Sequence, residues 1–340
     1  MRRFLPDTFT LMLIATVTLA SILPVSGPAV WWFGLATKVA IALLFFLHGA
    51  KLSREVMVTG LFHWRLHLTI IAATFALFPI LGLGLGLLPK SILPPALYTG
   101  ILFLCVLPST VQSSIAFTSM AGGNVPASIV AASGSNLIGM ILTPLLAGLL
   151  FSVGGHGGFS LDALEAIAVQ LLAPFLLGQV LQPWIGGWIR SRKALLDPVD
   201  RGSVLMVVYM AFSESITQGL WRTLSLRDIG VVIVADITLL ALVLAITTLC
   251  SRLLGFSRED EITIVFCGSK KSLASGVPMA SAIFSGQAIG GIVLPLMLFH
   301  QIQLMACAIL ARHYKSRLGH LTPAGPKTPD GTDVEIEAAE

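Results

Sequence analysis

Long apolar runs recur along nearly the whole chain, and this repetition constrains its fold more than any other feature. Such runs lie near residues 9–25, 31–49, 66–88, 97–121, 125–152, 163–185, 202–221, 229–251, 262–285 and 288–311. A helix needs about 20 apolar residues to span the hydrocarbon core of a bilayer, and most runs approach or exceed that length. The sequence therefore predicts an all-α membrane protein with about ten transmembrane helices, in one polytopic domain over residues 1–320.

Composition excludes a water-soluble fold. Of 340 residues, 55% are hydrophobic and only 11% are charged, whereas soluble domains carry about 25% charged residues. The net charge of +4 does not indicate a nucleic-acid partner, because most Lys and Arg lie between apolar runs. The tail 321–340 is rich in Pro, Gly and acidic residues, and we expect it to be a disordered cytoplasmic segment.

Cysteine spacing predicts neither a disulfide framework nor a metal centre. All four cysteines lie inside apolar runs, without CxxC spacing or nearby histidines: Cys105, Cys250, Cys267 and Cys307. We expect no bound cofactor or metal; the candidate coupling ions are sodium and the proton.

The distribution of basic residues predicts the topology, because cytoplasmic loops of membrane proteins are enriched in Lys and Arg. With a cytoplasmic N-terminus, the outside loops contain only Lys90, Arg222 and Arg227, and Lys38, Lys270 and Lys271 fall within spans. The other Lys and Arg residues all lie on the opposite side. We therefore expect a multi-pass protein of the cell inner membrane with both termini in the cytoplasm.

The chain divides into two halves of five spans, and the fourth span of each half is unusually polar. Residues 108–124 read PSTVQSSIAFTSMAGGN, and residues 267–282 read CGSKKSLASGVPMASA. Each is followed by a span with a proline, Pro144 or Pro295. Repeats of five spans must have opposite orientations, as in many transporters, where interrupted helices build a midplane binding site. The sequence predicts two inverted repeats with crossed, discontinuous helices four and nine.

Lys270 and Lys271 are the most informative polar residues, because a lysine inside a span costs about 2.5 to 3.5 kcal/mol on insertion scales. Either lysine can replace a coupling cation, bind an anionic substrate, or exchange a proton. The alternative is that the span is shifted and both side chains reach toward an interface.

Other polar residues in the spans are candidates for binding an ion or a substrate. They include Thr74 in span three, Gln112, Ser113 and Ser114 in span four, Ser128, Ser133 and Asn136 in span five, and His300 and Gln301 in span ten. His300 and Gln303 share a helix face. The alternative is ordinary hydrogen bonding and close packing between helices. Glu214 and Asp236 are candidate proton-relay residues, since intramembrane carboxylates are usually functional.

Three segments resemble the bile acid:sodium symporter family. They are GAKLSREV at 49–56, EITIVFCGSKKSLASGVPMA at 261–280 and LPLMLFHQIQLM at 294–305. More narrowly, the chain resembles a branch shared by bacteria and animals in which GSKKS replaces the usual sodium-binding sequence. The resemblance covers residues 1 to about 320. It implies a core domain of spans 3–5 and 8–10 that moves against a panel domain of spans 1, 2, 6 and 7, with two sodium ions behind the crossing of helices four and nine.

The resemblance also places the family's sodium ligands on this sequence. In spans three to five these positions fall at Thr74, near Ser113 and Ser114, and near Ser128 and Ala132 or Ser133. In span nine, Phe266 stands where the family has Glu, and Lys270 stands where the family has Gln. Relative to the family, this sequence therefore lacks a carboxylate at Phe266 and has an additional ammonium group at Lys270, at the positions where the family binds sodium. The hypothesis that follows is that Lys270 supplies the charge that sodium supplies elsewhere, so that transport is sodium-independent or proton-coupled.

Two functions follow as hypotheses. The first is a secondary transporter that moves a small organic anion through the lipid bilayer by alternating access. The second is a non-transporting membrane regulator or scaffold in ion or calcium homeostasis, because animal relatives of the branch are linked to calcium handling. An enzyme is not expected, since no HExxH or GxGD signature lies in any span. An ATP-driven pump is excluded by the missing Walker A loop. Substrate identity, transport direction and oligomeric state stay open.

Overall fold

The computed structural model describes residues 8–51, 63–89, 91–153, 172–217, 219, 225–284 and 289–319. Within these ranges the chain is almost entirely helical and contains no strand. The expected all-α class is therefore confirmed. The tail 321–340 and the start of the run at 163–185 lie outside the described residues.

The helices follow the predicted apolar runs closely. They are α1 (Thr8–Ile22), α2 (Ala29–Lys51), α4 (Trp64–Ala72), η3 (Ala73–Leu77), α5 (Phe78–Leu85), α6 (Pro95–Val106), α7 (Gln112–Ala121), α8 (Val125–Val153), α10 (Ala173–Ser191), α11 (Lys193–Thr217), α13 (Leu226–Leu253), α14 (Arg258–Gly268), α15 (Leu273–Ile283) and α16 (Ile289–Gly319). Among the described residues, five stretches are long and apolar enough to cross a membrane alone: 29–50, 64–85, 125–151, 226–253 and 289–316. Helices α1 and α6 add shorter apolar segments. The chain is thus a multi-pass membrane protein.

Two predicted spans are interrupted. The run at 97–121 is divided into α6 and α7 by residues 107–111, and the run at 262–285 into α14 and α15 by residues 269–272. Pro108 lacks an N–H and disfavours helical geometry in the residue before it, so α6 ends there. Leu107 is accordingly extended, with φ −73° and ψ 153°. Each interruption leaves unpaired backbone groups deep inside the protein.

A third irregularity lies in the middle of the helix formed by α4 and α5. The short η3 segment is a π-helical turn, in which the N–H of Phe78 donates to the carbonyl of Ala73. Pro79 follows and cannot donate a backbone hydrogen bond. Single π-turns inside α-helices occur frequently at functional sites, because they release a carbonyl from the helical ladder.

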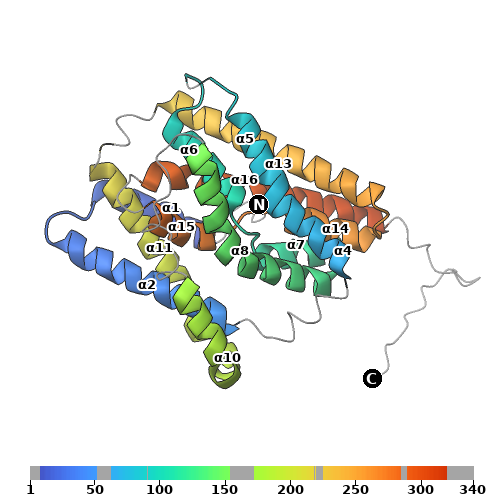
Figure 1. Ribbon diagram of the computed structural model, residues 1–340, viewed down its shortest axis with the longest axis horizontal. Coiled ribbons are helices and arrows are strands. Elements are labelled where there is room, and N and C mark those ends of the chain that lie inside the picture. The colour runs from blue at the N-terminus through green and yellow to red at the C-terminus, as the bar shows by residue number, and fades with distance from the viewer. Residues whose placement is uncertain are drawn as a thin grey trace, which may run out of the picture.

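The helices form two neighbouring groups (Figure 1). Helices α2 and α10 lie side by side and contact α11, which also contacts α1. Close approach of α2 and α10 depends on glycine: a Cβ at Gly49 would overlap the carbonyl of Phe175, and one at Gly178 the carbonyl of Phe46. Small residues of this kind let membrane helices approach closely.

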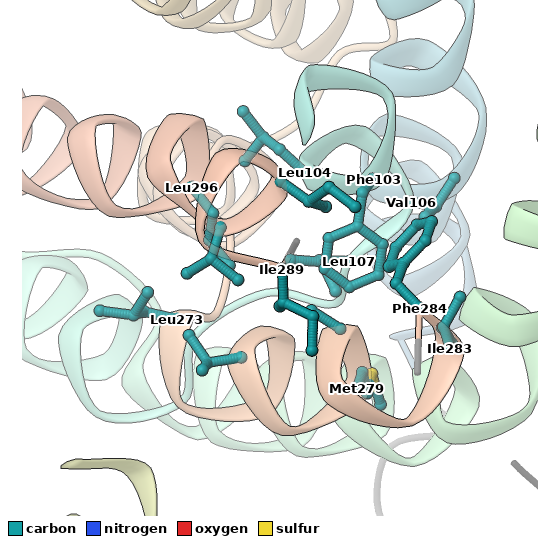
Figure 2. Close-up of a cluster of buried hydrophobic side chains, with 14 of the residues drawn as sticks. Phe103, Leu104, Val106, Leu107, Leu273, Met279, Ile283, Phe284, Ile289 and Leu296 are labelled. Atoms are coloured by element: carbon teal, nitrogen blue, oxygen red, sulfur yellow. The ribbon is translucent and has the colours of Figure 1, made fainter. Parts of the chain in front are cut away.

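The second group is centred on α6, α15 and α16. Figure 2 shows their apolar side chains, including Phe103, Phe284 and Leu296, meeting in one buried cluster. The rings of Phe103 and Phe284 are 5.4 Å apart in an edge-to-face arrangement, a geometry that aromatic pairs favour. Gly100 allows α6 to approach α16 closely. This packing holds both helix breaks in one place.

Candidate functional site

The two helix breaks are in direct contact, although they are about 160 residues apart in the sequence. The hydroxyl of Ser109 in the first break donates to the carbonyl of Cys267 at the end of α14, at 2.6 Å. The backbone N–H of Ser272 in the second break donates to the carbonyl of Pro108, at 2.9 Å. Each interruption therefore supplies a hydrogen-bond donor to a backbone carbonyl that the other interruption leaves unpaired.

Asn136 of α8 joins the two breaks. Its side-chain amide donates to the carbonyl of Ser109 at 2.7 Å. Its carbonyl oxygen accepts from the hydroxyl of Ser275 in α15 at 2.9 Å. Asn136 therefore holds the amino-terminal turn of α15 against the first break.

Lys271 is fully buried, and all three protons of its ammonium group have carbonyl partners. The Nζ atom donates to the backbone oxygens of Thr74 at 2.8 Å, Cys105 at 2.7 Å and Leu107 at 2.8 Å. Cys105 and Leu107 lie at the carboxyl end of α6, where carbonyls lack helical donors and the helix dipole favours a cation. The ammonium group occupies a set of carbonyl oxygens of the kind that binds a monovalent cation.

The π-turn explains why Thr74 takes part. In a regular α-helix the carbonyl of Thr74 would accept from the N–H of Phe78. In η3 that N–H donates to Ala73 instead, so the carbonyl of Thr74 is free for Lys271. The Thr74 hydroxyl bonds within its own helix, to the carbonyl of Ile70, so this residue contributes its backbone and not its side chain.

Gln303 of α16 fixes the backbone of the same lysine. Its amide oxygen accepts from the N–H of Lys271, and its amide nitrogen donates to the carbonyl of Lys271, both at 2.9 Å. The same nitrogen lies 3.0 Å from Nδ1 of His300. The predicted shared face of His300 and Gln303 is confirmed, and it links the second break to the middle of α16.

Lys270 is also fully buried but has different surroundings. Its Nζ lies 4.0 Å from the ring centre of Phe117 and 5.9 Å from that of Phe266, so cation–π attraction stabilises the charge. Within the described chain this Nζ has no hydrogen-bond partner. The Nζ of Lys271 also lies over a ring, 4.1 Å from the centre of Phe78, so the two lysines differ in the three carbonyl oxygens that Lys271 alone contacts.

A cavity of about 250 Å³ opens in front of the two breaks. Its walls come from both groups of helices: Phe9, Leu44, His48, Thr110, Val111, Gln112, Ser113, Asn136, Arg201, Val204, Ser272, Leu273, Ala274, Ser275, His300 and Leu304. The first residues of α7 and α15 are among them. Basic side chains are present, and no described Asp or Glu lines the cavity.

Comparison with known proteins decides the family. Residues 7–316 match the SBF-like CPA transporter family. The chain belongs to this family. The expected resemblance to the bile acid:sodium symporter family is confirmed at the level of this family, and the chain is a multi-pass membrane protein of transporter type.

Relatives of this SBF-like transporter come from bacteria and animals. The chain is 56% identical over 327 residues to "Uncharacterized protein PA2026" of Pseudomonas aeruginosa, which covers 96% of this chain and 98% of that protein. It is 52% identical over 315 residues to "Putative symporter YfeH" of Escherichia coli, covering 93% and 95%. It is 27% identical over 285 residues to "Sodium/bile acid cotransporter 7" of Rattus norvegicus, covering 82% of each.

Most candidate residues of the SBF-like transporter lie around the breaks. Gln112, Ser113, Asn136 and His300 line the cavity. Ser114 is buried behind it, where its hydroxyl lies 3.3 Å from that of Ser109 and donates to the carbonyl of Phe266. These side chains therefore serve both the cavity and the contact between the breaks.

The remaining candidates lie away from the cavity. The hydroxyl of Ser128 lies 3.2 Å from the sulfur of Cys267, and Ser133 is half-buried on α8. Gln301 and Glu214 are half-buried on α16 and α11, and Asp236 is fully buried on α13. Lys270 and Lys271 belong to the second break but do not line the cavity.

Several residues at the breaks and the cavity were not singled out from the sequence. Ser109, Thr110, Ser135, Ser272 and Ser275 make the contacts within and between the breaks. Two others, His48 and Arg201, line the cavity from α2 and α11. Ser109, Ser272 and Ser275 belong to the polar segments that marked the breaks, whereas Ser135 lies in α8. Nothing in local sequence brings α2 and α11 to the same cavity.

Proposed function

We propose that this SBF-like protein is a secondary transporter that moves a small organic anion by alternating access, with the cavity at the two helix breaks as its binding site. The observation that carries the proposal is the cavity itself. It receives the amino ends of α7 and α15, and no described acidic side chain lines it. Amino ends of helices attract anions through their free N–H groups and the helix dipole.

Side chains around the cavity support an anionic substrate. Arg201 supplies a positive charge from α11, and His48 and His300 supply imidazoles from α2 and α16. Gln112 and Ser113 offer hydrogen-bond donors at the start of α7. The volume of 250 Å³ lies just below the usual range of about 300 to 1,000 Å³ for ligand pockets, which favours a small carboxylate or sulfonate over a steroid-sized acid.

The arrangement of the helices supports alternating access. The proposed core contains α4 to α8 and α13 to α16, and the proposed panel contains α1, α2, α10 and α11. The cavity has walls from both. Motion of the core against the panel would therefore expose the cavity to each side in turn. On the topology expected from the basic loops, His48 near the end of α2 and Arg201 in the first half of α11 lie toward the cytoplasm, and the proposed state of the described conformation is inward-facing.

Lys271 supports transport without bound sodium. Its ammonium occupies the carbonyl oxygens of Thr74, Cys105 and Leu107. A protein-bound charge at this point would stabilise the carboxyl end of α6 in every state. We therefore retain the hypothesis that one lysine replaces a coupling cation, and we assign this role to Lys271 instead of Lys270.

Uptake into proteoliposomes tests the proposal. The panel of labelled solutes is lactate, succinate, benzoate, methanesulfonate and taurocholate, with choline as the cationic control. We expect uptake of one or more of the small anions in sodium-free buffer, and none of choline. Arg201→Gln should raise KM about tenfold, the loss of roughly 1.4 kcal/mol of attraction.

Arg192→Gln is the matched control, because Arg192 is an exposed arginine between α10 and α11 that does not line the cavity. It should leave KM unchanged. Uptake that responds equally to both variants, or purified protein that binds an anion but never releases it across the bilayer, would argue against the proposal. The second outcome would favour the non-transporting regulator.

A further inference from the structure

Asp236 is a buried acid that the contacts around the cavity do not use. It lies ten residues into α13 (Leu226–Leu253), about 15 Å from the start of that helix. Its side chain is 0% exposed. Neither carboxyl oxygen has a hydrogen-bond partner among the described residues.

An ionised carboxylate is not expected in such a place. A charged Asp at the centre of a membrane helix costs about 2.5 to 3.5 kcal/mol even on lenient scales. Burying a charge without a partner is so unfavourable that the group takes its neutral form instead. In the described conformation, Asp236 therefore holds a proton.

The neighbours of Asp236 supply no counter-charge in this conformation. Helix α13 packs against η3, α5, α14 and α16, and η3 and α5 have no ionisable side chain. The ionisable residues in the sequences of the other two helices are Arg258, Glu259, Asp260, Glu261 and Cys267 for α14, and His300, Cys307, Arg312, His313, Tyr314, Lys315 and Arg317 for α16.

Two of these groups are held at the far end of α13. Glu261 accepts from Arg252 at 3.0 Å and from Tyr314 at 2.9 Å. Arg252 is sixteen residues beyond Asp236, or about 24 Å along the helix. Cys105 of α6 is an electrostatic neighbour of both Asp236 and Lys271.

We propose that Asp236 is the proton-binding site that couples this carrier to the proton gradient, so that one proton moves with each anionic substrate. The proposal rests on the proposed transport function. A proton binds the carboxylate when the core is open to the acidic side, and the O–H bond breaks on the other side. The substrate charge and the proton charge cancel, so the moving core gains no net charge.

Transport with and without a pH gradient tests this coupling. The labelled substrate is the small anion of the panel that wild type exchanges fastest. In proteoliposomes with an acidic outside, wild type should accumulate this anion. Asp236→Asn mimics the protonated acid with the same shape. It should lose accumulation entirely and keep exchange of internal for external anion at the wild-type rate.

Two further variants complete the design. Glu259→Gln removes an exposed carboxylate from the first turn of α14, and it should accumulate the anion as wild type does. Asp236→Glu retains a carboxyl group and should retain accumulation. Accumulation by Asp236→Asn, or accumulation by wild type that ignores the pH gradient, would overturn the proposal.

Infrared spectroscopy gives a readout that needs no substrate. Wild type at neutral pH should show the carbonyl stretch of a protonated carboxylic acid, and Asp236→Asn should lack that intensity. Equal spectra would overturn the proposal. If neither protein exchanges any anion, the transport function fails, and the spectra still decide whether Asp236 holds a proton.

Discussion

Lys270 and Lys271 are adjacent in sequence, but their ammonium groups have different partners. Lys271 donates to three backbone carbonyls, whereas Lys270 faces the rings of Phe117 and Phe266. From sequence, both lysines could be recognised as functional candidates because charge is rare at membrane depth. Which one meets the carbonyls could not be predicted, because side-chain directions in an irregular segment follow no helical period.

Substitution of each lysine by methionine should give opposite results. Lys271→Met leaves three buried carbonyls without donors, and we expect it to lower the free energy of unfolding by at least about 3 kcal/mol, because each buried acceptor without a donor costs about 1 to 3 kcal/mol. Lys270→Met removes a desolvated charge that interacts with the thiols of Cys267 and Cys307 and gains cation–π attraction worth about 0.5 to 2 kcal/mol, and it adds an apolar side chain of similar length.

Thermal unfolding in detergent compares the two variants under one condition. Lys270→Met should unfold within a few degrees of wild type or above it, and Lys271→Met well below it. Equal destabilisation by both variants would show that the three carbonyl contacts of Lys271 stabilise the protein no more than the contacts of Lys270 do.

At the scale of elements, the interrupted helices depend on close approach between α6 and α16. A Cβ on Gly100 would lie 2.5 Å from the backbone oxygen of Ile292 and 2.9 Å from Cγ of Pro295. The apolar runs and both breaks were predictable, because hydrophobic length and clustered serines are local features. The π-turn at Ala73–Leu77 was not, since Pro79 predicts a kink but not which carbonyl is released.

Gly100→Ala should therefore destabilise the protein. We expect a loss of about 1 to 3 kcal/mol from overpacking, because the clashing atom belongs to the backbone and cannot rotate away. The matched control is Gly134→Ala in α8, where a Cβ meets no atom within 4 Å. That variant should be neutral or stabilising by up to about 1 kcal/mol. Chemical denaturation of both proteins checks the difference; a Gly100→Ala protein as stable as Gly134→Ala would refute the close contact.

At the scale of the whole molecule, the proposed alternating access depends on the separation of the two groups of helices. Direct contacts between them run mainly from α11 to α15 and α16, and the hydroxyl of Ser215 accepts from the N–H of Gly290 at 2.8 Å. The membrane class and helix order followed from composition and apolar runs. The cavity could not be predicted from the sequence, because it brings together His48, Arg201 and the breaks, which are spread over more than 200 residues.

The most direct test of the account is the thermal stability of purified wild type in increasing sodium chloride, matched at each ionic strength by potassium chloride. Because the ammonium of Lys271 already occupies the carbonyl oxygens behind the breaks, we predict identical unfolding temperatures in the two salts. A saturable rise that sodium produces and potassium does not would show that a sodium ion binds, and would contradict the assignment of Lys271 as the built-in cation.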